Sequence, residues 1–201
     1  MNLTLQADHL RALLTVAADS KKDPRRHLYG AHFHAGRRGV IGMATNGSMM
    51  LVAWCSAIPA PDGYWFAPGC WKVPAGIKTA ELSNTGEGEN LSASLTYPGG
   101  ALSWHADDTH VTGNTRIEWE RSVPRTVSGE PAYFDPDLLA LFNKASGFLG
   151  HKVGPSIRSN GDGPALVTFA DSLVFGVIMP MRKELMDSPP EWFAPALAVA
   201  A

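Results

Sequence analysis

The feature of this sequence that most limits its fold is a repeated order of elements. A strand, a helix and then two or three further strands are predicted three times, at a spacing of roughly 60 residues. The 20 Gly and 15 Pro are spread along the chain and are typical of many turns and short strands. The sequence therefore predicts an architecture of similar units that mix helix and sheet.

The first unit opens with a helix pattern in 7–23, for which Asp8 is the expected N-cap. Its apolar residues recur at helical spacing and would form one face: Leu10, Leu13, Leu14, Ala17 and Ala18. Strands are predicted in 27–35 and 39–58, separated by the turn "GRRG" and interrupted by "TNGS".

The second unit is predicted to begin in 63–84 with a strand and a weak helix interrupted by Pro and Gly. Short strands are expected in 90–98, 100–106 and 110–120, with "YPGG" as the turn between the first two.

The third unit has the clearest helix start, because Asp135 is a good N-cap and Pro136 suits the first helical position. Gly150 is the expected stop, and three strands are predicted in 154–179. These patterns divide the chain into a domain at 1–125, made of half-units 1–58 and 59–125, a half-unit at 126–182 and a tail at 183–201.

Charge and composition exclude several classes of protein. Seventeen basic and 19 acidic residues give a net charge of −2, which argues against gripping nucleic acid by bulk charge, although a locally basic surface stays open. No apolar run approaches the ~20 residues of a membrane span, and the first residues lack the pattern of a signal peptide. We expect a cytoplasmic protein with no cofactor, whose two cysteines are reduced.

The sequence contains few residues that would support an enzymatic function. His32 and His34 would face the same way in a strand and could bind a metal, but no third ligand stands at a recognisable spacing. Cys55 and Cys70 carry no local signature of a nucleophile and are expected to be small core residues. A metal- or thiol-dependent enzyme on an unrelated fold therefore remains as an alternative, and we expect neither a metal site nor catalysis.

The stretch "LVFGVIMPMR" at 173–182 raises a choice between two interpretations. Pro180 cannot donate to a β-ladder, so it must lie at a strand end or a sheet edge. The residues then form either a core strand that ends at a proline or a surface that uses flexible Met side chains to accommodate different guests.

Three stretches together resemble the bacterial DNA polymerase sliding clamp, the beta subunit of the replicative polymerase. They are residues 23–54 with "ATNGSMM", the link "EWERSVP" at 118–124, and 133–182, which ends on Met-Pro-Met-Arg. In the first stretch Asn46 replaces an Asp of the family signature, while Gly47 is kept. The positions of His, Arg and Leu are taken by Ser48, Met49 and Met50.

The resemblance implies an α+β, DNA-clamp-like fold of strand-helix-strand half-units, with curved antiparallel sheets and helices on one face. Only three half-units are placed, so the family's first domain and half of its third have no counterpart. The resemblance also implies a hydrophobic cleft at a domain boundary, where polymerase or clamp-loader partners insert a short peptide with Leu and Phe anchors. Carried over by position, this cleft would use Arg25, Leu28, Thr45, Gly47, Ser48, Met49, Met50, Pro124, Val177, Met179, Pro180, Met181 and Arg182.

Ring clamps hold DNA by encircling it, which requires only a thin positive lining on the helices. The candidates, each of which could equally be a solvated surface charge, are Arg11, Lys21, Lys22, Arg26, Lys72, Lys78 and Lys144. The preferred function is a reduced, non-enzymatic processivity ring in DNA replication, built as a homo-oligomer and suggestive of a phage or mobile element. The alternative is a decoy or modulator that keeps the peptide cleft and does not encircle double-stranded DNA.

Residues 183–201 extend past the point where family chains stop. Pro189 and Pro190 favour an extended segment, so Trp192 and Phe193 could reach back into the cleft or dock on a second copy. A disordered terminus is the other interpretation.

Overall fold

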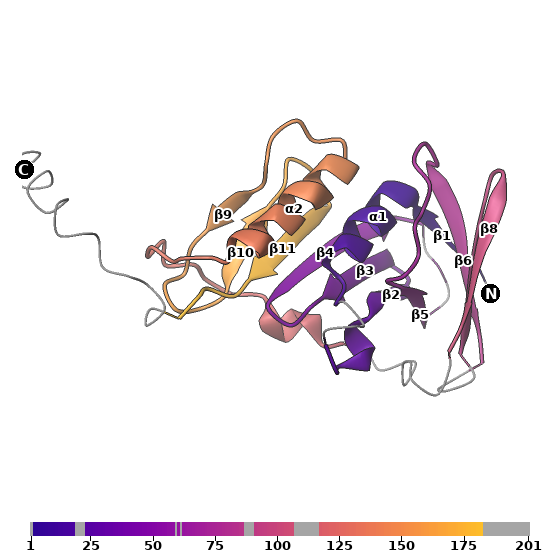
Figure 1. Ribbon diagram of the computed structural model, residues 1–201, viewed down its shortest axis with the longest axis horizontal. Helices are drawn as coiled ribbons and strands as arrows, with labels where there is room; N and C mark the ends of the chain where they lie inside the picture. The colour runs from indigo at the N-terminus through magenta and orange to yellow at the C-terminus, as the bar shows by residue number, and fades with distance from the viewer. Residues whose placement is uncertain are drawn as a thin grey trace, which may run out of the picture.

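Two antiparallel sheets and two α-helices make up the part of the chain that the structure, a computed structural model, describes (Figure 1). The described residues are 2–18, 23–58, 60, 62–86, 91–106 and 117–182. The predicted α+β class is confirmed.

The larger sheet has seven strands in the order β5-β2-β3-β4-β11-β10-β9. Their bounds are β2 Gly30–Gly36, β3 Gly39–Thr45, β4 Met49–Ser56, β5 Gly63–Pro68, β9 Ser156–Arg158, β10 Ala165–Thr168 and β11 Val174–Ile178. The smaller sheet has the order β1-β6-β7-β8, with β1 Asn2–Gln6, β6 Thr79–Thr85, β7 Ser92–Tyr97 and β8 Gly100–His105.

The larger sheet joins segments that are far apart in the sequence, because β4 pairs with β11. The register runs antiparallel from Ala53 opposite Val174 to Met49 opposite Ile178. One further hydrogen bond extends the ladder, from Met179 N to Ser48 O at 2.9 Å. The third predicted unit is therefore continuous with the sheet of the first.

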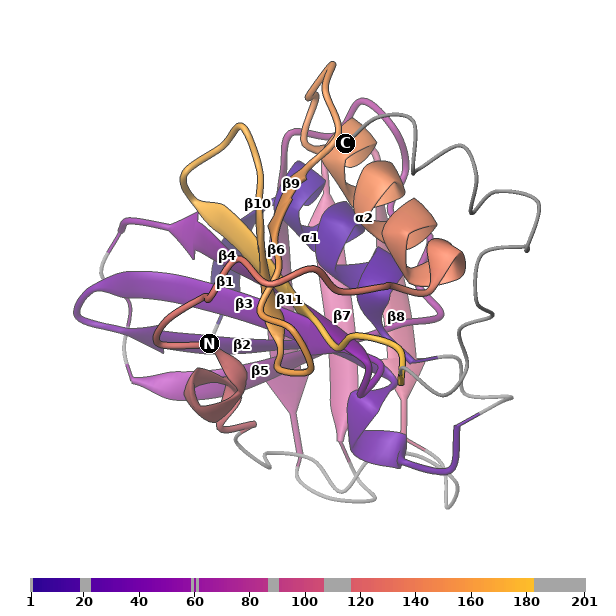
Figure 2. The same ribbon diagram turned by 90° about the vertical axis from the view of Figure 1, so that its left-hand side faces the viewer.

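Helices α1 (Ala7–Val16) and α2 (Pro136–Phe148) lie side by side on one face of the seven-stranded sheet (Figures 1 and 2). The α2 prediction is confirmed: Asp135 accepts a hydrogen bond from Asp137 N at 2.8 Å, and the helix ends just before Gly150 at φ +77°. The two helices and the sheet share one core, in which Leu10, Leu13 and Phe142 are buried.

The start of α1 differs from the prediction. Gln6 is the N-cap and makes no side-chain cap, while Asp8 lies in the first turn and pairs with Arg11. The reason is β1, a strand that the sequence analysis missed, which runs directly into the helix.

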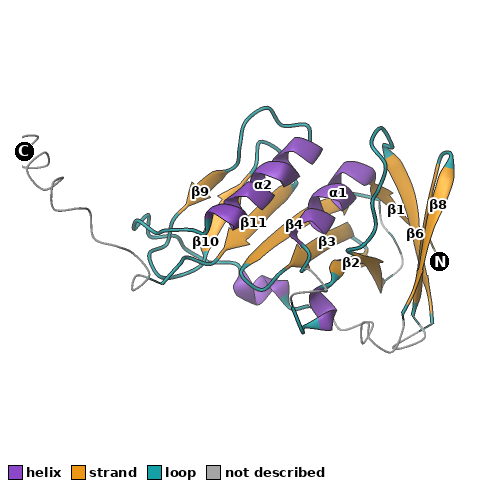
Figure 3. Cartoon of the chain, in the orientation of Figure 1, coloured by secondary structure: helices purple, strands orange, loops and turns teal. Residues whose placement is uncertain are grey.

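The helix predicted within 63–84 is wrong. After β5 the chain forms turns and loop through residues 69–78, as the cartoon in Figure 3 shows, and then enters β6. Trp71 and Val73 from this loop are buried in the main core. Pro74 cannot donate to a helix, and Gly76 adopts φ +85°, so the loop supplies apolar cover without helical hydrogen bonds.

The strand predicted in 110–120 is also wrong where it can be checked. Residues 117 and 118 are not in a strand, and the 3-10 helix η3 (Trp119–Ser122) follows them. Residues 107–116 lie outside the described part of the chain. Among the helices that the structure describes, none has the length and apolar character needed to cross a lipid bilayer.

Candidate functional site

The outer face, by which we mean the face of the seven-stranded sheet away from α1 and α2, carries a second apolar cluster. Side chains alternate along a strand, so Met49 and Leu51 pack into the main core while Met50 and Val52 point outward. The outer cluster consists of Met43, Met50, Val52 and Val177, packed against Ile41, Ile117, Trp119, Val123 and Phe175.

A hollow opens at the edge of this cluster, where the turn before β4 meets the end of β11. We call it the Met179 hollow, and its volume is about 100 Å³. Its lining residues are Thr45, Gly47, Ser48, Met49, Met50, Ile117, Trp119, Ser122, Val177 and Met179. Seven of the thirteen residues predicted for the peptide cleft are therefore brought together here.

The turn at residues 45–49 is fixed by its own polar groups. The Asn46 side-chain oxygen accepts hydrogen bonds from Ser48 N and Met49 N, both at 3.0 Å, and Thr45 Oγ1 donates to Met49 O at 2.6 Å. An amide oxygen accepts these bonds as a carboxylate would, which explains why Asn46 can replace the family's Asp. Gly47 has φ +88°, a conformation that favours glycine.

Arg25 lies over this turn without lining the hollow. Its guanidinium donates to Asn46 O at 2.9 Å and pairs with Asp23, whose carboxyl pKa it lowers to about 2. A Cβ on Gly47 would lie 2.3 Å from Arg25 Nη1, so the small residue also makes room for the arginine.

Five more of the predicted cleft residues do not line the hollow. Leu28 is buried, Pro124 and Pro180 are half-buried, and Arg182 is exposed. Met181 N donates to Tyr133 O at 2.8 Å, which directs the chain after β11 toward the segment that precedes α2.

Three lining residues were missed by the sequence analysis: Ile117, Trp119 and Ser122. They belong to the link that was recognised as "EWERSVP", but a strand was predicted up to residue 120. The available signal was the aromatic residue in the link, because a Trp in a polar stretch commonly packs on an apolar surface.

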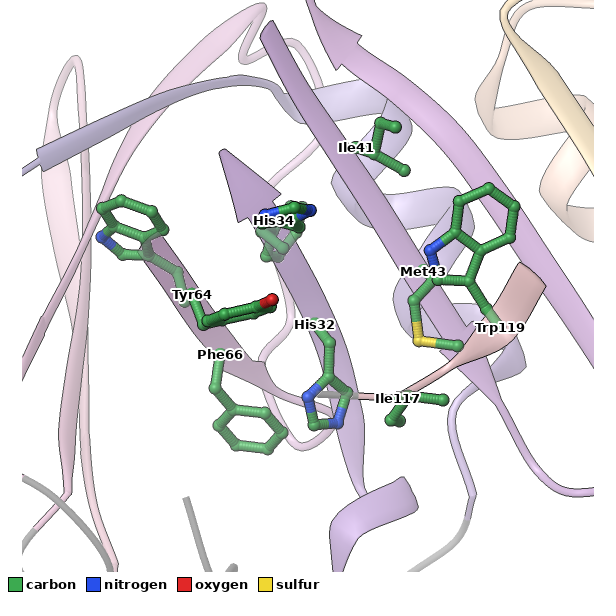
Figure 4. A pocket seen from close by; sticks show the side chains of 10 residues that line it. His32, His34, Ile41, Met43, Tyr64, Phe66, Ile117 and Trp119 are labelled. Atoms are coloured by element: carbon green, nitrogen blue, oxygen red, sulfur yellow. The ribbon is translucent and has the colours of Figure 1, made fainter. Parts of the chain in front are cut away.

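A second hollow lies beyond Trp119 on the outer face (Figure 4). It is small, about 30 Å³, and shares Ile117 and Trp119 with the Met179 hollow. The rings of His34 and Tyr64 stack at 4.8 Å with planes 8° apart, and His32 meets Phe66 edge-on at 5.2 Å. We call it the aromatic hollow. Its remaining lining residues are Phe33, Ile41, Met43 and Trp65.

His32 and His34 do share a face of β2, as predicted, but the surroundings suit packing rather than metal binding. His32 Nε2 donates to His27 O at 2.7 Å, and burial lowers the pKa of His32 to about 4. Within the described residues, no three His, Cys, Asp or Glu side chains come together as a metal site.

This burial predicts an acid-dependent loss of stability. The folded-state pKa of His32 lies below the ordinary value of 6.5, so its contribution is fully present above pH 6.5 and is lost as the pH falls toward 4. We expect wild-type protein to lose about 3 kcal/mol more unfolding free energy than His32→Gln between pH 7 and pH 4. Urea titrations at several pH values measure this. His34→Gln is the control, because that ring is exposed, and a wild-type slope in His32→Gln would contradict the assignment.

The cysteines are poorly suited to nucleophilic chemistry. Cys55 is fully buried, and burial raises the pKa of its thiol to about 12. The core prediction is wrong for Cys70, which is exposed. Partial desolvation still raises the pKa of its thiol, which disfavours the reactive thiolate.

The candidates for DNA contact are scattered. Arg11 donates to Pro74 O at 2.6 Å and to Ile77 O at 3.1 Å, and its side chain is only 10% exposed, so it is not free to meet phosphate. Lys144 is exposed on α2, whereas Lys72 and Lys78 are exposed on the loop that replaced the predicted helix. Lys21, Lys22 and the tail 183–201 lie outside the described residues, and the side chain of Arg26 is not described.

No protein-family model and no curated protein matches this chain. Solved structures do match it. The DNA polymerase III beta subunit of Thermotoga maritima aligns with a TM-score of 0.61 and 10% identity over 90% of this chain. The Borrelia burgdorferi subunit, in complex with a natural product, gives 0.62 and 9% over 90%, and the Pseudomonas aeruginosa sliding clamp bound to griselimycin gives 0.57 and 13% over 90%.

These matches show that the chain has the fold of the bacterial sliding clamp, as the sequence resemblance implied. The chain spans 65% of the length of the Thermotoga and Pseudomonas proteins and 63% of the Borrelia protein.

Proposed function

We propose that this chain is a non-enzymatic, clamp-like protein that binds short linear peptides in the Met179 hollow. The observation that carries the proposal is the meeting of two motifs that are more than a hundred residues apart. The turn at 45–49 and the end of β11 lie side by side, joined by the hydrogen bond from Met179 N to Ser48 O. Together they border an open apolar hollow.

The chemistry of the hollow suits an apolar anchor. Met179 is 45% exposed although it is large and hydrophobic, and it faces the solvent beside the buried Met50 and Val177. Exposed Met side chains adapt to different apolar guests. A volume of about 100 Å³ accommodates one aliphatic side chain rather than a drug-sized molecule.

The likeness to solved sliding clamps supports a class of partner. Two of the solved clamps carry a bound compound, griselimycin in one and a natural product in the other. We infer that the ligand here is a clamp-binding peptide of a replication protein, such as a polymerase or a clamp loader. A processivity role would require several copies of this chain to close a ring.

Substitution of Met179 gives the sharpest test of peptide binding in the hollow. We expect Met179→Ala to weaken a Leu-Phe clamp-motif peptide by about tenfold, or about 1.4 kcal/mol, because a central anchor contact is lost. The matched control is Leu173→Ala, since Leu173 is 42% exposed and precedes the other end of β11. Isothermal titration of the peptide against both variants measures the difference. Equal peptide affinities for the two variants would show that the Met179 hollow does not bind the peptide.

A second candidate is a modulator that binds the same peptides without encircling DNA. Helices α1 and α2 carry only Arg11 and Lys144 as basic residues, against Asp8 and Asp137. Arg11 is occupied within the chain, so α1 and α2 together offer one exposed Lys or Arg for phosphate. Such a face favours peptide binding over a grip on DNA.

A further inference from the structure

Trp119 occupies the middle of the outer face, and both hollows end against it. In Figure 4 its indole lies beside Met43, across the hollow from His34 and Tyr64. On the opposite side Trp119 borders Met50 and Val177 in the Met179 hollow. Its ring centre lies 6.0 Å from that of Phe175, at an angle of 55°. The surface beneath Trp119 is therefore apolar and partly aromatic.

The segment that carries Trp119 is held on the sheet mainly by side chains. The backbone hydrogen bonds seen in it are local: Trp119 N donates to Ile117 O at 2.9 Å, and Arg121 N donates to Glu118 O at 3.2 Å. Its Arg121–Glu118 ion pair is solvent-exposed, with side chains 81% and 54% accessible, so it contributes little to stability. The hydrogen bonds of a short 3-10 helix have poorer geometry than those of an α-helix, so the backbone of η3 contributes little to fixing Trp119 in place.

The size of the Met179 hollow limits what it can hold while Trp119 is in place. A hollow of about 100 Å³ is smaller than the roughly 150 Å³ of an engineered apolar cavity that binds benzene. An aliphatic anchor fits beside Trp119, but an aromatic anchor needs the space that the indole occupies.

The geometry points to a binding site for an aromatic side chain beneath Trp119, filled in the free protein by the chain's own indole. This inference rests on the proposed function for the identity of the incoming ligand, the Phe of a peptide that also carries a Leu. The Leu enters the Met179 hollow, and the Phe displaces Trp119. The linker thereby acts as a tethered competitor that lowers the apparent affinity for two-anchor peptides.

The test compares wild type with Trp119→Ala and a matched control, Trp54→Ala. Trp54 is 44% exposed on β4 and lines neither hollow. The probes are free indole, a Leu-Phe peptide and its Leu-Ala version. We expect indole to bind Trp119→Ala saturably and to raise its melting temperature, but not that of Trp54→Ala. We expect the Leu-Phe peptide to bind Trp119→Ala about tenfold tighter than wild type. This factor corresponds to an indole that leaves the site free in about a tenth of the wild-type molecules.

The Leu-Ala peptide should bind Trp119→Ala no tighter than wild type, because its single anchor does not compete with the indole and loses one wall of the Met179 hollow. Trp119→Leu retains an apolar cover and should show the same tightening to a smaller extent, which preserves the test if the alanine variant does not fold. If free indole did not raise the melting temperature of Trp119→Ala, the aromatic site would be ruled out. Indole binding together with weaker Leu-Phe binding would overturn the displacement and make Trp119 a wall of the peptide site. Indole binding with no peptide binding to any variant would leave the aromatic site standing and defeat the proposed function.

Discussion

Phe142→Ala should lower the unfolding free energy by about 3–5 kcal/mol, the largest effect that we expect from a single substitution in this chain. Phe142 is 1% exposed and projects from α2 onto β11. A Cβ on Gly176 would lie 2.5 Å from the Phe142 ring, so the ring rests directly on the glycine. Gly176 in turn pairs with Leu51 of β4.

The same change should disturb the Met179 hollow from the opposite face of the sheet. Loss of the ring loosens β11, and β11 supplies Val177 and borders Met179. Chemical denaturation gives the stability, and peptide titration gives the effect on the hollow. Lys144→Ala is the control on the same helix, because its side chain is exposed and we expect a change within about 0.5 kcal/mol. Equal stabilities for the two variants would mean that the third unit does not belong to the common core.

Several strands and turns were predicted from the sequence because their signals are local. Gly47 and Asn46 specify the turn before β4, and Asp135 with Pro136 specifies the start of α2. The meeting of this turn with Met179 is not local, and only the resemblance to the clamp family indicated it. Side chains alternate between the two faces along a strand, so the sequence could have shown that Met49 and Met50 point to opposite faces of the sheet. Only Met50 belongs to the outer cluster.

The errors arose where packing decided the structure. A weak helix interrupted by Pro and Gly was predicted within 63–84, yet Pro74 and Gly76 break it altogether. Trp71 and Val73 reach the core from a loop. Trp119 fell within the strand predicted in 110–120, but it lies in η3 and packs on the outer cluster. Met50 and Met179 were both predicted to belong to the cleft. Met50 is only 5% exposed and Met179 is 45% exposed, so Met179 is the better probe of the hollow.

Arg11→Ala should lower the unfolding free energy by about 3 kcal/mol and leave any affinity for duplex DNA unchanged. The guanidinium donates to Pro74 O and Ile77 O and pairs with Asp8, so its removal leaves two loop carbonyls without their charged donor. The loop that carries Trp71 and Val73 would then lose its attachment to α1.

A phosphate-binding arginine would behave in the opposite way. Its loss would spare stability and would reduce the slope of log affinity against log salt concentration by about one. Duplex titrations at several salt concentrations, read beside denaturation curves, separate the two roles. Lys144→Ala is the matched variant, because Lys144 is the exposed Lys or Arg on α1 and α2. If Arg11→Ala flattened the salt dependence at unchanged stability, the arginine would face DNA and the ring interpretation would gain over the modulator. With the expected result, Lys144 is the exposed Lys or Arg that α1 and α2 retain for phosphate, which favours the proposed modulator over a ring.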